Sequence, residues 1–136
     1  MVRNIILVAL GGALGAGLRY ILSIYLIRGM GKTLGLDRFI WWEAFKIPTL
    51  WINLLSCLLI GLLYEYFIEL PKYKLLLITG FLGGLSTFSA FGLESLNLFH
   101  TKSFGALITY ILVSVLLGIV LVWLGYLISN ELFQSK

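Results

Sequence analysis

The chain has 136 residues, of which 60% are hydrophobic and 12% charged, and its mean hydropathy is +1.03. Soluble domains carry about 25% charged residues, so this chain lacks the polar groups to cover a surface in water. Its ten Lys and Arg and six Asp and Glu are scattered singly, which argues against nucleic acid as a partner. We therefore expect one membrane-embedded domain, with room for four helices of about 20 apolar residues each.

Four apolar stretches predict four membrane-spanning helices in an all-α protein. They cover residues 5–27, 48–68, 75–99 and 103–130, within one domain over 1–136. A glycine-rich turn at residues 29–32 is expected to end the first helix, and Pro48 opens the second, since a first helical turn tolerates proline. Part of residues 28–46 is expected to form an interfacial helix, because its charges alternate with aromatic side chains. The aromatic residues are Phe39, Trp41, Trp42 and Phe45.

Basic residues are almost equally divided between the two ends of the predicted bundle. One end carries Arg3, Lys72, Lys74 and Lys136, and the other carries Arg28, Lys32, Arg38, Lys46 and Lys102. Because Lys and Arg asymmetry in short loops sets membrane orientation, this division predicts weak orientation or insertion in both directions. A difference of a few residues arising by chance is the alternative.

Small residues in the first span surround a membrane-embedded arginine. Gly11, Gly15 and Arg19 follow one another at four-residue spacing, so they share one helical face. Close approach of a neighbouring helix at the glycines would shield the guanidinium, and we expect Arg19 to face protein or water. The alternative is an arginine that extends its charge to the nearer interface.

The second span carries an amide that lipid cannot satisfy. Asn53 is followed by Ser56, Cys57 and Gly61 on the same side of the helix, which predicts a close-packed seam with one polar group. Asn53 either serves a functional site or only joins two helices. Cys57 has no cysteine partner in the chain and is expected to pack as a small hydrophobic residue.

The third span contains the strongest anomaly in the sequence. Residues 80–92 hold four glycines, three hydroxyl side chains and three phenylalanines. This composition predicts a break in the helix between Gly83 and Thr87, with a continuous glycine-rich packing helix as the alternative. Backbone freed at this depth must be buried in protein or bind an ion. Freed carbonyl oxygens suit a small cation such as sodium, and freed amides suit an anion.

Aromatic and hydroxyl side chains of the third and fourth spans fit an anion path. Phe88, Phe91 and Glu94 lie three residues apart on one face, and phenylalanine rings are positive at their edges. Phenylalanines that merely face lipid or the core are the alternative. In the fourth span, Tyr110 and Ser114 share a face with Gly118, and their hydroxyls either donate to an anion or bond to the preceding turn.

No nucleophile with a matching base, no cluster with metal-ligand spacing and no phosphate-binding loop occurs in the sequence. We therefore expect a protein that is not an enzyme.

Four motifs together resemble the small fluoride channels of the CrcB or Fluc family. They are GGxxGAxxRY at 11–20, TLxIN at 49–53, GFxGGxSTFSxF at 80–91 and YxxxSxxxG at 110–118. The third is long and specific, and the resemblance covers essentially the whole chain.

The resemblance implies a four-helix protein of the cell membrane that assembles as an antiparallel, dual-topology homodimer, with two fluoride pores and a structural sodium ion. By position, Gly83 and Ser86 resemble the residues whose backbone carbonyls hold sodium. The residues similar to those of the pore are Asn53, Phe88, Phe91, Tyr110 and Ser114, with Thr87 and Glu94 near its path.

This chain departs from the usual family pattern at four positions. Ser86 and Ala90 stand where threonine is usual, Ser56 replaces a glycine, and Gly118 offers no hydroxyl where some members have serine. A backbone-carbonyl role tolerates the change at Ser86, and the expected path survives the others.

The sequence is also compatible with two other functions. A small dual-topology exporter of organic cations would need a membrane-buried carboxylate for proton coupling, which only Glu94 could supply. A non-transporting scaffold protein would use Asn53 and the glycine-rich run solely to join helices.

Overall fold

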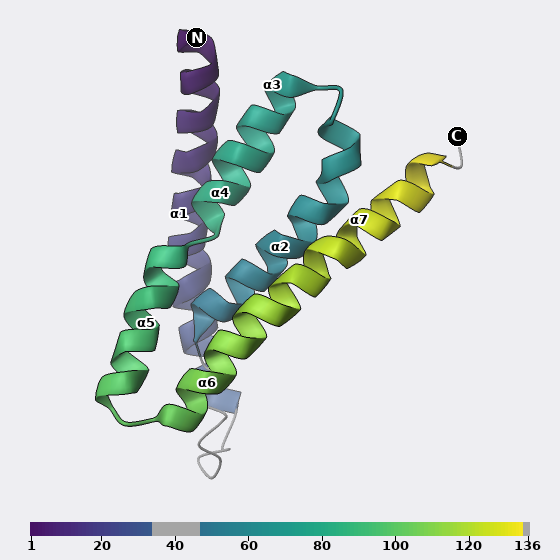
Figure 1. Cartoon of the computed structure of the whole chain (residues 1–136). Helices are drawn as coiled ribbons and strands as arrows, with labels where there is room; N and C mark the ends of the chain where they lie inside the picture. Colours follow the sequence, from purple (N-terminus) through teal and green to yellow (C-terminus); the bar gives the residue numbers. More distant parts are fainter. Residues whose placement is uncertain (34–46, 135–136) are drawn as a thin grey trace.

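The computed structural model describes residues 1–33 and 47–134, and every regular element within them is a helix (Figure 1). Four helical segments are long and apolar enough to cross a membrane: Val2–Arg28, Pro48–Phe67, Pro71–His100 and Phe104–Leu132. The prediction of an all-α protein with four spans is confirmed. The four aromatic residues of the expected interfacial helix lie outside the described residues.

The first span is helix α1 and the second is helix α2, whereas the third and fourth are each built from several pieces. The bounds are α1 Val2–Thr33 and α2 Pro48–Phe67; α3 Pro71–Tyr73, the π-helical η2 Lys74–Leu82, α4 Gly83–Leu85 and α5 Phe88–His100; then α6 Phe104–Leu112, the π-helical η3 Val113–Leu117 and α7 Gly118–Gln134. The expected turn at residues 29–32 is wrong, because α1 continues through it to Thr33. Glycine lowers helix propensity without removing a backbone hydrogen bond.

Alternate spans run in opposite directions, so both termini lie at the same end of the molecule (Figure 1). Arg3 lies in the first turns of α1, and Lys72 and Lys74 lie at the turn that opens the third span, at this same end. Lys102 lies at the opposite end, in the short connection between α5 and α6.

Two seams of backbone against backbone hold the spans together. A side chain at Gly11 would overlap the carbonyl oxygen of Leu76 in η2, and one at Gly15 would overlap that of Phe81. In the same way, Gly61 of α2 lies against α7, and Gly125 of α7 lies against α2. Because lipid tails are as apolar as the side chains, such close van der Waals contact is a main source of attraction between helices in a membrane.

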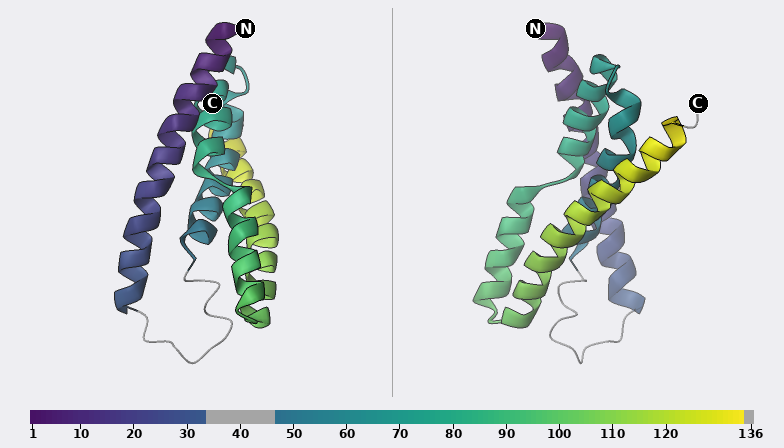
Figure 2. Two further views of the ribbon diagram at one scale, coloured as in Figure 1. Left: turned by 90° about the vertical axis from the view of Figure 1, so that its left-hand side faces the viewer. Right: turned by 45° about the vertical axis from the view of Figure 1, so that its right-hand side comes forward.

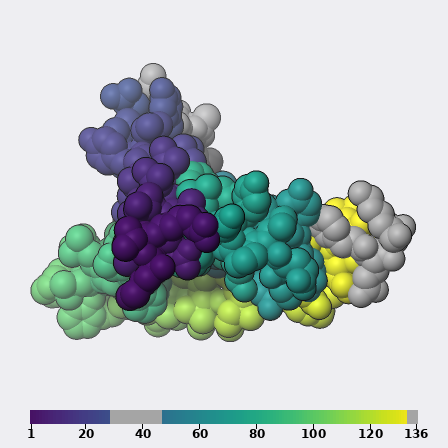
Figure 3. All heavy atoms as spheres, turned by 90° about the horizontal axis from the view of Figure 1, so that it is seen from above, coloured from purple at the N-terminus to yellow at the C-terminus, as the bar shows by residue number. Residues whose placement is uncertain are grey.

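The third span is interrupted at Ser86 and Thr87, within the range expected from the sequence. Ser86 has ψ of 153° and Thr87 has φ of −150° and ψ of 121°, which are extended conformations. Above the break, η2 and α4 pack against α1, whereas below it α5 leaves α1 and packs against α6 (Figure 2). Seen from above, α1 projects from a slab formed by the other helices (Figure 3).

Helix α2 contributes to both buried clusters and so fixes the two halves of the third span. Leu50 and Leu54 join Ala106 and Tyr110 in one cluster, and Ile52 joins the second. The other members of the second cluster are Leu82 and Leu85, which lie immediately before the break. The break therefore lies against the first half of α2.

Candidate functional site

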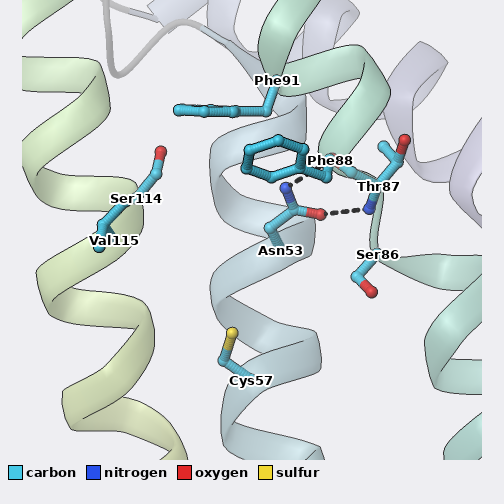
Figure 4. Close-up of a pocket in the computed structure, with 8 residues that line it drawn as sticks. All are labelled: Asn53, Cys57, Ser86, Thr87, Phe88, Phe91, Ser114 and Val115. Carbon is cyan, nitrogen blue, oxygen red and sulfur yellow. Dashed lines mark hydrogen bonds between the residues drawn. The ribbon is translucent and has the colours of Figure 1, made fainter.

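An open pocket of about 230 Å³ lies beside the break in the third span (Figure 4). Its walls come from α2, from the extended residues and the start of α5, and from η3. The lining residues are Asn53, Cys57, Ser86, Thr87, Phe88, Phe91, Ser114 and Val115. Five of the seven predicted pore residues are among them.

Asn53 joins α2 to the broken backbone through both ends of its amide. Its Nδ2 donates to the carbonyl oxygen of Thr87 at 3.1 Å, and its Oδ1 accepts from the backbone N–H of Thr87 at 2.8 Å (Figure 4). An asparagine amide carries two N–H donors, and these bonds use one of them. Asn53 thus connects two helices and also lines the pocket with a further N–H.

The hydrogen bonds at the break release two backbone carbonyls. In a continuous helix the Thr87 N–H would donate to Gly83, and the Ala90 N–H would donate to Ser86. Instead, the Thr87 N–H goes to Asn53, and the Ala90 N–H donates to the Thr87 side-chain oxygen at 3.3 Å. The carbonyl oxygens of Gly83 and Ser86 therefore lose their intrahelical donors. Oxygen ligands of this kind suit a hard cation.

Aromatic rings form a line from the mouth of the pocket toward the interior. The ring centroids of Phe88 and Phe91 are 5.3 Å apart, and those of Phe91 and Tyr110 are 5.1 Å apart. Phe88 is 82% exposed in the single chain, whereas Tyr110 is fully buried. The outer end of this aromatic line thus has no cover from its own chain.

Glu94 and Tyr110 lie beyond Phe91 rather than in the pocket itself. The Glu94 carboxylate accepts a hydrogen bond from Tyr110 Oη at 2.6 Å and another from Thr49 Oγ1 at 2.7 Å. These bonds join α5 to α6 and to α2. Thr49 was not among the predicted site residues, although its four-residue distance from Asn53 places both on one face of α2.

Ser114 brings to the pocket a hydroxyl donor without a partner in the described part of the protein. Its Oγ is buried and has no hydrogen-bond partner among the described residues, and the side chain lies across the pocket from Asn53 (Figure 4). Cys57 also lines the pocket, and its Sγ lies 3.5 Å from where a side chain at Gly118 would begin. Cys57 was expected only to pack as a small hydrophobic residue. Val115 was not predicted, because an apolar side chain gives no signal within an apolar span.

Gly11, Gly15 and Arg19 lie outside the pocket. The two glycines belong to the seam with the third span. Arg19 has a half-buried side chain, and its carbonyl oxygen accepts a hydrogen bond from Ser23 at 2.8 Å. These three residues thus belong to the packing of α1.

The pocket is lined by hydrogen-bond donors and phenylalanine rings, and none of the described residues that line it is charged. Over residues 1–33 and 47–134, no group of three or more His, Cys, Asp and Glu could hold a metal ion. A hydroxyl, an amide N–H and phenylalanine edges attract a small anion without a countercharge that would hold it tightly.

The sequence matches a known family over most of its length. A family model described as "CrcB-like protein, Camphor Resistance (CrcB)" matches residues 6–126. The chain belongs to the CrcB family. Its four apolar helices and this membership make it a multi-pass membrane protein.

Curated CrcB relatives match nearly end to end, and those compared share one name. A protein of Methylobacillus flagellatus is 42% identical, with 97% of this chain and 98% of the relative covered. One of Rhizobium etli is 39% identical over 93% and 96%, and one of Aquifex aeolicus is 35% identical over 92% and 95%. Each is named "Fluoride-specific ion channel FluC".

Proposed function

We propose that the protein is a passive, fluoride-selective channel of the cell membrane that lowers the fluoride concentration inside the cell. The observation that carries this proposal is the neutral, donor-lined pocket at the helix break, in a chain 42% identical to a relative named as a fluoride-specific ion channel. A channel needs neither a nucleophile nor a redox centre, in keeping with a protein that is not an enzyme.

Fluoride is small and strongly hydrated. A path for it must replace the hydrating water with other hydrogen-bond donors, and each site must bind the ion weakly enough to release it. Ser114 supplies an O–H and Asn53 supplies its second N–H from opposite walls of the pocket. The rings of Phe88, at the mouth, and Phe91, further in, add weakly positive edges along the path. Glu94, held by two hydroxyls, and Tyr110 border the far end of this path.

We further propose that two copies form an antiparallel, dual-topology homodimer. The pocket is open on one side, and Phe88 at its mouth is largely exposed in the single chain. A second copy would cover this ring and complete the path. The near-equal division of basic residues between the two ends supports insertion in both orientations.

A structural sodium ion is proposed at the break, held by the carbonyl oxygens of Gly83 and Ser86 from each copy. The diversion of the Thr87 and Ala90 N–H groups supports this assignment, because it leaves both carbonyls without their intrahelical donors. The ion would supply positive charge that holds two broken helices together, and it is not transported.

The proposal is tested by recording efflux from proteoliposomes with a fluoride-selective electrode, using chloride as the control anion. We expect rapid fluoride efflux that needs no proton gradient, together with negligible chloride efflux. Proton-coupled efflux of an organic cation without fluoride efflux would instead indicate an exporter. Vesicles impermeable to both anions would contradict any channel function and indicate a scaffold role.

A further inference from the structure

Several serines in the membrane-embedded helices share one hydrogen-bonding pattern, in which the hydroxyl bonds to the backbone of its own helix. Four of them donate to the carbonyl oxygen four residues earlier, at 2.8 to 3.0 Å. They are Ser23, Ser56, Ser86 and Ser95. A hydroxyl bonded in this way has given its only proton to its own helix. It cannot donate that proton to an anion at the same time.

Ser114 departs from this pattern and lies in a different kind of turn. It is the second residue of η3, a five-residue π-helical segment between α6 and α7. The N–H of Val113, which precedes it, is shared between the carbonyls of Thr109 and Tyr110. The Tyr110 carbonyl is the one that the Ser114 hydroxyl would use in an ordinary helix, and here it accepts from the Val113 N–H three residues on while Ser114 Oγ has no partner among the described residues.

The widened turn and the pocket coincide. Both residues that the fourth span contributes to the pocket, Ser114 and Val115, belong to η3. A π turn holds one residue more than an α turn and commonly marks a functional site. The extra residue of η3 lies between α6 and α7, at the level of the pocket.

We infer that η3 is a positioning element that keeps the Ser114 hydroxyl out of the intrahelical bond and presents it to the pocket as the donor for fluoride. This inference rests on the proposed channel function. It assigns a role to the backbone of Val113–Leu117 rather than to a further side chain.

Ser129 provides a matched control within the same span. It is also buried, and its hydroxyl also has no partner among the described residues. It lies in the regular helix α7 and does not line the pocket. A missing hydrogen bond alone is therefore not expected to affect transport, and Ser129→Ala should conduct like the wild type.

The test removes the extra residue of the turn. Deletion of Leu117, or of Leu116 as a second variant, restores α-helical spacing, and both side chains are exposed on the single chain. Wild-type fluoride efflux is measured first, so that failure of the channel proposal is seen separately. We expect each deletion, and likewise Ser114→Ala, to lower fluoride efflux about tenfold, because each removes one hydrogen bond to an anion. Leu117→Ala, which keeps the chain length, should leave efflux unchanged.

The double variant decides between positioning and simple structural support. If η3 acts through Ser114, deleting Leu117 in the Ser114→Ala protein lowers efflux no further. A further tenfold loss would overturn the inference, since the turn would then matter without the hydroxyl. Wild-type efflux in the single deletions would overturn it, and so would failure of both deletions to assemble, because removing one residue of a π turn should leave α6 and α7 in place.

Discussion

The third span contains two regions rich in small residues: the part of η2 that packs against α1, and the break beside α2. The first is closely packed, whereas the second borders an open pocket. At the seam, Gly11 and Gly15 bring backbone into direct contact with backbone and leave no room for a side chain. At the break, the backbone lacks intrahelical hydrogen bonds and borders a pocket of about 230 Å³. The seam excludes any ligand, and the break makes room for one.

The difference comes from what lies opposite each glycine-rich stretch. A second glycine-containing helix faces the seam, so van der Waals contact alone stabilises the pair. Asn53 faces the break and supplies both a donor and an acceptor to Thr87. Extended backbone within a membrane is tolerated where protein groups satisfy it. The Asn53 amide thus stabilises the break, together with the Thr87 side chain that accepts from the Ala90 N–H.

The largest expected effect is on the seam. Replacing Gly15 with leucine should prevent assembly, because the new side chain overlaps the Phe81 backbone and overpacking costs about 3 kcal/mol. Gly17→Leu is the matched control, since nothing lies within 4 Å of a side chain at that position. Size-exclusion profiles and thermal unfolding in detergent measure both. A well-folded Gly15→Leu protein would show that the seam is dispensable.

The next prediction concerns the phenylalanines of the pocket, whose replacement should affect transport and not folding. Changing Phe88 and Phe91 together to isoleucine should abolish fluoride efflux from liposomes while the protein still assembles, because the ring edges are lost but apolar volume is largely kept. The control pair is Phe99 and Phe104, whose rings also contact each other, with centroids 5.7 Å apart, but lie outside the pocket. Undiminished efflux in the Phe88 and Phe91 variant would contradict their assignment to the path.

The smallest effect on stability concerns the connection between the two regions. Asn53→Ala removes two hydrogen bonds from the broken backbone, and interhelical bonds in membranes contribute about 0.6 kcal/mol each. We expect a loss of about 1 kcal/mol in unfolding free energy together with a clear loss of fluoride efflux. Asn97→Ala, at an exposed position of α5, is the control. Unchanged stability and efflux would mean that the break holds without Asn53.

Much of this arrangement could be predicted from residue type and spacing. The apolar stretches give four spans, because each must satisfy its own backbone in lipid. The glycines and hydroxyls of residues 80–92 place the break correctly, and the four-residue spacing of Gly11 and Gly15 indicates a close helix contact. The helical continuation of α1 past residue 29 could not be predicted, since glycine weakens a helix without requiring it to end.

The partners of the polar groups were beyond sequence reasoning. Asn53 and Thr87 are 34 residues apart in the chain, and nothing local in either motif connects them. The π turns have no distinctive composition: η3 reads Val-Ser-Val-Leu-Leu, like any apolar helix. The spacing of Tyr110 and Ser114 places them on one helical face. In the structure, however, Tyr110 donates a hydrogen bond to Glu94, whereas Ser114 lines the pocket.

Residue type and order are enough to establish that this protein uses lipid as its solvent, how many times it crosses the membrane, and where the third helix is interrupted. Hydropathy and helix propensity depend on residues that are close together in the chain, so they can be evaluated from the linear sequence. Which donors are used and which remain free depends on how the helices pack. A hydrogen bond across helices depends on distances of about 3 Å between residues far apart in the chain, and such distances exist only after the helices have packed.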